Sequence, residues 1–169
     1  MQNGEYKKLT TGIQFLREAK KHGLVDNLAD RGFKHLKGLY IYRFYGEGIH
    51  QLILGSASYG ENLTFDITCI VDEIDSRYVR NFPINVPLLC GGGFGDEYFT
   101  PELWEIATLD NVGEISQSIV DVFDGFPKKW FDSVSTRQKF VDELYPHIRE
   151  KYEESGAIKK VLSGWPKNA

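Results

Sequence analysis

The chain has 169 residues, of which 41% are hydrophobic and 14% aromatic, so it can build a sizeable core and we expect a single domain over residues 1–169. Its formal net charge of -4 argues against a general nucleic-acid binder, which presents a basic surface. Neither a membrane-spanning apolar stretch nor a secretory leader stands out, so we expect a cytoplasmic protein without a membrane partner.

Apolar residues at three- and four-residue spacing predict a helix in the first third, with its stripe formed by Leu9, Ile13, Leu16, Ala19, Leu24 and Leu28. Gly23 is expected to bend this helix. Gly32 follows the pattern, with Arg31 in the last turn, as is typical of a helix end.

From residue 39 the hydrophobic period changes to two. The stretches LYIYRFY (39–45) and IHQLILGSASY (49–59) are separated by GEG, and together they predict a hairpin. Residues 63–71 alternate between apolar and polar, which indicates a half-buried strand. Short connections between these strands favour an antiparallel meander.

A short helix is predicted over residues 73–82, with Asp72 as its cap. Residues 102–109 fit either a helix beginning near Pro101 or a fourth strand, and we favour the strand.

The last third is predicted to be helical. A helix from Asp110 or Asn111 is expected to end at Gly125 and Pro127, and Ser135 is expected to cap another. Pro146 predicts a kink or restart, and the tail from residue 157 predicts a short amphipathic turn. The fold expected is α+β, with a four- or five-stranded antiparallel sheet and the N-terminal and C-terminal helices packed on one face.

The most unusual stretch is CGGGFGDEYF (90–99). It fits neither a dinucleotide fingerprint nor a Walker loop, and we expect a mobile binding loop that presents Phe94, Asp96 and Tyr98. The alternative is that these side chains pack over one edge of the sheet.

No complete catalytic constellation is evident. The serines of GSASYG (55–60) lack the hydrolase elbow pattern, and the histidines lack metal-ligand spacing. Cys69 and Cys90 lack the spacing of a zinc site or a disulfide framework, so we expect reduced thiols, no metal and no cofactor. Catalysis is left uncertain, leaning towards a protein that is not an enzyme.

Aromatic residues are the more informative signal. Tyr40, Tyr42 and Phe44 share one face of the predicted strand, and Arg43 lies on the other. An exposed tyrosine stripe beside arginine is typical of a protein-binding surface. The alternative is that helices cover both faces.

The segments RGFKHLKG, YRF, LTFDITCIVD, LWEI and ISQSIVDVFDGFPKKWFDSVST occur in this order. Because of these segments and their order, the chain resembles, over roughly residues 9–145, a family of small bacterial proteins described only as a domain of unknown function. The resemblance implies an α+β fold and a bacterial origin, and carries over no catalytic residue. The chain departs from the family at Thr68, where an asparagine is expected, and at Gly55–Ser56, where a Gln-Ser step is expected.

The leading prediction is a non-enzymatic cytoplasmic protein-binding module, such as an immunity protein that blocks a bacterial toxin. Its candidate binding residues are Tyr40, Tyr42, Arg43, Phe44, His50, Phe94, Asp96, Tyr98 and Trp104. The alternative is a small-ligand protein or enzyme with a pocket between the sheet and the 90–99 loop, using His50, Arg43 or Asp66. A homodimer formed through the exposed sheet face is a third prediction.

Overall fold

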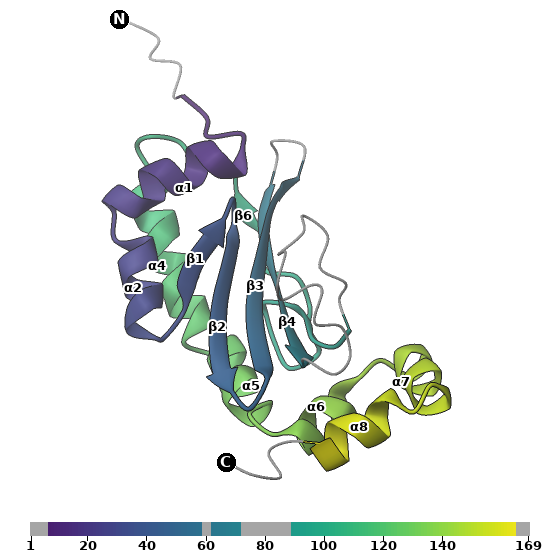
Figure 1. The fold of residues 1–169 in the computed structure, drawn as a ribbon. Helices are drawn as coiled ribbons and strands as arrows, with labels where there is room; N and C mark the ends of the chain where they lie inside the picture. Colours follow the sequence, from purple (N-terminus) through teal and green to yellow (C-terminus); the bar gives the residue numbers. More distant parts are fainter. Residues whose placement is uncertain (1–6, 59–61, 72–88, 165–169) are drawn as a thin grey trace, which may run out of the picture.

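An antiparallel sheet runs through the molecule and carries helices on one face (Figure 1). The computed structural model describes residues 7–58, 62–71 and 89–164, so the helix predicted over 73–82 lies outside the described residues. This arrangement confirms the predicted α+β fold with an antiparallel sheet.

The sheet is a meander with two short additions. Its strands are β1 (Lys34–Lys37), β2 (Tyr40–Gly46), β3 (Ile49–Ser58), β4 (Asn62–Val71), β5 (Gly92–Gly93) and β6 (Trp104–Glu105). The order is β1-β2-β3-β4-β5, and β6 pairs with the beginning of β4. The predicted hairpin and third strand are confirmed. The strand favoured over 102–109 is confirmed only at its two residues in β6, and β1 was not predicted.

Four helices lie over one face of the sheet (Figure 1): α1 (Gly12–Lys21), α2 (Leu24–Asp30), α4 (Val112–Phe123) and α5 (Phe126–Ser133). Three more follow beyond the β2–β3 turn: α6 (Arg137–Glu143), α7 (Pro146–Glu154) and α8 (Ala157–Gly164). No helix among the described residues has the length and apolar character needed to cross a membrane.

The helix boundaries follow local chemistry, with one correction. Gly23 has a φ of 82° and separates α1 from α2, as predicted. The helix predicted to end at Gly125 and Pro127 is α4, which ends at Phe123; α5 then begins at Phe126 and has Pro127 in its first turn. The cap of α6 is Thr136 rather than Ser135: its hydroxyl accepts a hydrogen bond from the Lys139 amide. The restart at Pro146 is confirmed by α7.

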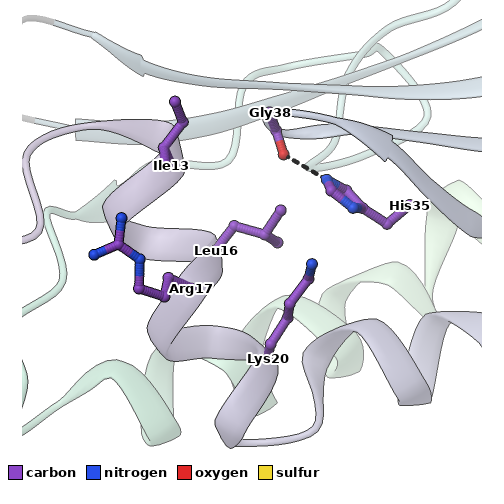
Figure 2. A pocket seen from close by; sticks show the side chains of 6 residues that line it. All are labelled: Ile13, Leu16, Arg17, Lys20, His35 and Gly38. Carbon is purple, nitrogen blue, oxygen red and sulfur yellow. Dashed lines mark hydrogen bonds between the residues drawn. The ribbon is translucent and has the colours of Figure 1, made fainter.

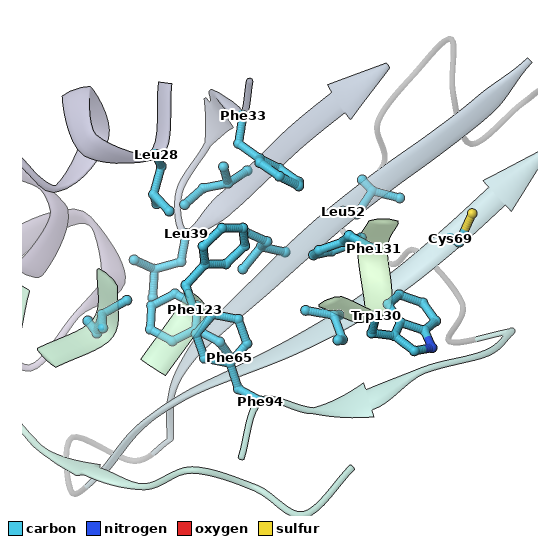
Figure 3. Packing of buried hydrophobic residues seen from close by; sticks show 14 of the residues in the cluster. Leu28, Phe33, Leu39, Leu52, Phe65, Cys69, Phe94, Phe123, Trp130 and Phe131 are labelled. Atoms are coloured by element: carbon cyan, nitrogen blue, oxygen red, sulfur yellow. The ribbon is translucent and has the colours of Figure 1, made fainter. Parts of the chain in front are cut away.

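The core between sheet and helices is rich in aromatic rings (Figure 3). Phe33 packs against Phe123 and Phe131, with ring centroids 5.4 and 5.0 Å apart. Phe65 on β4 contacts Phe94 at 5.6 Å. These contacts anchor β4, the helices and the segment after residue 90 to one another, and they leave the predicted binding residue Phe94 inside the core.

Candidate functional site

The sheet divides the residues that the sequence marked as binding candidates. Cross-strand register pairs Arg43 with Gln51 on the helix-covered face. Tyr42 and His50 lie on the opposite face, where the Tyr42 hydroxyl and His50 Nδ1 are hydrogen bonded at 3.0 Å and the rings are stacked. Tyr40 follows the same alternation as Tyr42, and the Phe44 backbone pairs with His50. The candidates therefore do not form one cluster.

Arg43 is part of the packing between sheet and helices. Its Nε donates to Gln51 Oε1 at 2.9 Å, and another guanidinium nitrogen donates to the Arg31 carbonyl at 3.2 Å. The guanidinium carbon also lies 4.4 Å from the centre of the Phe33 ring. These contacts link β2 to the end of α2 and explain an arginine in a half-buried position.

The glycine run after residue 90 is a close-packing segment. At Gly91, with a φ of 86°, a Cβ would overlap the Ile67 carbonyl oxygen of β4. At Gly93 a Cβ would lie 2.5 Å from the Phe99 carbonyl oxygen. The Gly93 amide donates to that same carbonyl, and Gly92 and Gly93 form β5. Glycine is needed here because two backbones meet without room for side chains.

The side chains that this segment was expected to present have different surroundings. Phe94 is 1% exposed, and Trp104 is buried with its Nε1 donating to Ser118 Oγ at 2.9 Å, so neither projects. Asp96 holds the turn by accepting hydrogen bonds from the Tyr98 and Thr100 amides. Hydrogen bonding from the Thr100 side chain is the main cause that lowers the pKa of Asp96. Only Tyr98, at 80% exposure, extends from this segment as predicted.

The two cysteines are buried free thiols. Burial raises the pKa of Cys69 well above its ordinary value and raises that of Cys90 to about 12. The Cys90 thiol donates to the Cys69 carbonyl at 3.6 Å. Both groups are therefore protonated at neutral pH and lack the thiolate that nucleophilic or metal-binding chemistry requires.

Asp66, the carboxylate named for a pocket beside the 90–99 loop, pairs with Leu54 and Gly93 within the sheet. Partial burial raises its pKa. Among the described residues, no group of three or more histidine, cysteine, aspartate or glutamate side chains is placed to hold a metal ion.

Two of the described cavities lie beside α1. The first, which we name the basic cavity, has a volume of about 290 Å³ and is lined by Ile13, Leu16, Arg17, Lys20, His35 and Gly38. Figure 2 shows Leu16, Lys20 and His35 pointing toward a common space between α1 and the β1–β2 turn. The Arg17 guanidinium points away from His35 in this view. Leu16 forms an apolar floor between two nitrogen-bearing side chains.

Helical spacing and a tight turn bring these groups together. Leu16 and Lys20 are four residues apart on α1 and share one face of the helix. A capping box at Thr11 begins α1: Thr11 Oγ1 accepts from the Gln14 amide, and Gln14 Oε1 accepts from the Thr11 amide. Across the cavity, His35 Nε2 is 2.9 Å from the Gly38 carbonyl, and because a carbonyl only accepts, this nitrogen carries a proton.

A second cavity adjoins the first at Gly38. It has a volume of about 490 Å³, and we name it the neutral cavity because none of its described lining residues is charged; they are Thr10, Thr11, Gly12, Gly38, Leu39, Tyr40, Gly55 and Ala57. The two cavities share Gly38 as a common wall.

The net charge of the N-terminal region could have indicated the basic cavity, whereas the net charge of the whole chain does not. Residues 1–38 contain eight lysines and arginines against four acidic residues, although the complete chain has a net charge of -4. The remaining residues are therefore strongly acidic, and the positive groups concentrate on the first helices and β1. Regional charge indicates which end of the fold attracts anions.

Comparison of the chain with protein-family models, with curated proteins and with solved structures found no significant match. The resemblance to a family of small bacterial proteins thus stays a prediction.

Proposed function

We propose that this protein binds small organic anions and that the basic cavity is the binding site. The observation that carries the proposal is the Lys20 ammonium group beside the apolar side chain of Leu16, opposite His35, whose Nε2 proton is donated to the Gly38 carbonyl. No acidic residue occurs among the described residues that line this cavity. An anion in this space meets a fixed positive charge without a competing carboxylate.

The combination of charge and apolar floor defines the ligand chemistry. An ammonium group gives a carboxylate or phosphate a charge-assisted hydrogen bond, which is about twice as strong as a neutral one. Leu16 is buried, and an apolar ligand body that packs against it loses contact with water. Inorganic ions use only the first interaction, so an organic anion is expected to bind more tightly.

The test is a titration of the isotope-labelled full chain followed by amide chemical shifts. Benzoate and phenyl phosphate are the anionic probes, and benzyl alcohol is the uncharged one. We expect saturable shifts of the Arg17, Lys20, His35 and Gly38 amides with the two anions only. Lys20→Gln should weaken anion binding about tenfold, as expected for the loss of a charged hydrogen bond.

Lys21→Gln is the matched control. It removes the same charge from the next residue of α1, where the ammonium group pairs with Glu18 at 3.1 Å instead of lining the cavity. If both variants lowered the anion affinity equally, the effect would come from the overall charge of α1, and this would contradict the proposed site. An equal response to benzyl alcohol would contradict anion selectivity.

A protein partner, such as the toxin of a toxin–immunity pair, is the second candidate function. The observation that favours it is the exposure of Tyr98 and Leu103, at 80% and 62%, on the segment between β5 and β6. The turn around Asp96 holds the Tyr98 backbone amide, and an exposed tyrosine is a typical interface anchor.

This second candidate is tested by alanine variants in a binding assay with any stoichiometric protein partner that the tagged chain retains. Tyr98→Ala should lower the affinity by about 2 kcal/mol if Tyr98 is an anchor. Leu162→Ala is the control, because Leu162 is also exposed and lies on α8. Unchanged affinity in the Tyr98 variant would remove this surface from consideration.

A further inference from the structure

The basic cavity opens beside a larger space of different chemistry. With about 290 Å³, it is close to the lower limit of ordinary ligand pockets, whereas the adjoining neutral cavity adds about 490 Å³. The two meet at Gly38. A ligand confined to the basic cavity would leave the neutral cavity unused.

The walls of the neutral cavity favour an uncharged ligand body. Leu39 and Ala57 supply apolar surface, and Gly12 and Gly55 expose backbone without side chains. The hydroxyl of Thr11 accepts a hydrogen bond from the Gln14 amide in the cap of α1, so part of its acceptor capacity is already used. The groove is thus cationic at one end and mainly apolar at the other.

Gly38 keeps the junction open. Its φ is 56°, and a Cβ built there meets no atom within 4 Å, so a side chain at this position has open space where the cavities meet. Gly55 is different, because a Cβ there would lie 2.5 Å from Leu39 Cβ and 2.7 Å from the Phe65 ring. Gly55 is required by packing, whereas substitution at Gly38 changes the groove.

We propose that one extended amphipathic anion occupies both cavities, with its carboxylate or phosphate head beside Lys20 and His35 and its apolar body passing Gly38 into the neutral cavity. This inference rests on the proposed anion-binding function. It adds that the physiological ligand is longer than the basic cavity alone can hold, and that affinity grows with apolar length.

The experiment compares straight-chain carboxylates of increasing length, from butyrate through hexanoate to octanoate, with the alkyl phosphates of the same lengths as a second series. Each methylene that enters the neutral cavity should tighten binding up to about fourfold. Octanoate should shift the amides of Thr11, Gly12 and Ala57, whereas butyrate should shift only those of the basic cavity. The two series distinguish a carboxylate head from a phosphate head.

Gly38→Asn is the diagnostic variant, since asparagine tolerates positive φ better than most residues. It should remove the gain from chain length, so that butyrate and octanoate bind the variant with equal affinity. Gly156→Asn is the matched control: Gly156 has a φ of 77°, equally open space and a position between α7 and α8, away from both cavities. Should Gly38→Asn fail to fold, the amides that octanoate shifts in the unsubstituted chain decide the question.

Equal affinity for butyrate and octanoate would overturn the extended-ligand proposal, as would a length dependence that survives Gly38→Asn. In both cases the proposed function would still stand if Lys20→Gln weakened butyrate binding. Absence of any saturable binding of anions would overturn both proposals together.

Discussion

Gln51 is a buried polar residue whose amide groups both have partners. It is 0% exposed, its Nε2 donates to the Phe131 carbonyl at 2.7 Å, and its Oε1 accepts from Arg43 Nε at 2.9 Å. One side chain therefore joins β3 to α5 and also orients the arginine of the neighbouring strand. Buried polar groups of this kind stabilise a fold only while every partner is satisfied.

Gln51→Leu should destabilise the protein by about 2–3 kcal/mol, because it leaves the Phe131 carbonyl and Arg43 Nε without this partner in a dry environment. Urea denaturation measures the difference. Gln117→Leu is the control: Gln117 is exposed, and its Nε2 donates to Asp121 Oδ1 at 2.9 Å, one turn along its own helix. Its effect should stay within about 0.5 kcal/mol. Similar losses in both variants would contradict the role assigned to Gln51.

The ion pair between Arg31 and Asp124 predicts a pH dependence. Arg31 Nε and a second guanidinium nitrogen approach the two Asp124 oxygens at 2.5 and 2.6 Å, and these hydrogen bonds lower the pKa of Asp124. Because the folded pKa lies below the unfolded value of about 3.9, the stabilisation is complete above that value. It disappears as the pH falls through the folded pKa.

A double-mutant cycle with Arg31→Gln and Asp124→Asn measures this pair. The coupling free energy should be about 0.5–1 kcal/mol at pH 7, since the pair is partly exposed, and should approach zero well below pH 3.9. A coupling that stays constant down to acid pH would show that the carboxylate charge is not the cause.

At the scale of elements, the sequence predicted those strands and helices whose apolar residues follow a clear period of two or of three to four. The alternation from Leu63 to Val71 identified β4, although the predicted half-burial holds only in its first half, because every residue from Ile67 to Val71 is buried. The sequence pattern did not show that Pro127, which follows the end of α4 as predicted, also lies in the first turn of α5. The four residues of β1 are too few to display a period, so only pairing with β2 reveals this strand.

The N-terminus of α6 allows a test of which residue caps the helix, Ser135 as the sequence predicted or Thr136 as the structure shows. Thr136→Ala should cost about 1 kcal/mol, because the Thr136 hydroxyl accepts from the Lys139 amide. Ser135→Ala, at the residue that the sequence favoured as the cap, should change stability little. Thermal and urea unfolding of the two variants compare them directly. A larger loss at Ser135 would move the helix start by one residue.

At the scale of the whole molecule, the candidate site depends on contacts that sequence spacing does not show. Lys20 and His35 come from different elements and face each other only because α1 packs beside the β1–β2 turn. The aromatic residues that dominate the sequence, Phe94 and Trp104 among them, are needed for the core. Residue type alone therefore did not separate core residues from binding residues, since aromatic residues serve both purposes.

Arg137 connects distant parts of the chain. Two of its guanidinium nitrogens donate to the Glu47 carbonyl in the β2–β3 turn, at 3.2 and 2.7 Å, and a third donates to the Val161 carbonyl of α8 at 3.1 Å. The side chain is buried, so these carbonyls have little access to water. One residue of α6 thereby holds the end of the sheet and the last helix together.

Arg137→Met should destabilise the protein by about 3 kcal/mol, since it keeps the apolar stem but removes charged hydrogen bonds worth about 1.5–3 kcal/mol each when counted singly. Amide hydrogen exchange should accelerate in α8 and in the β2–β3 turn more than in β4, because the lost contacts join these two regions. Lys139→Met is the control on the same helix, where the ammonium group makes a partly exposed pair with Glu143 at 2.8 Å. If exchange accelerated uniformly in the Arg137 variant, the residue would contribute to global stability without coupling the C-terminal helices to the sheet.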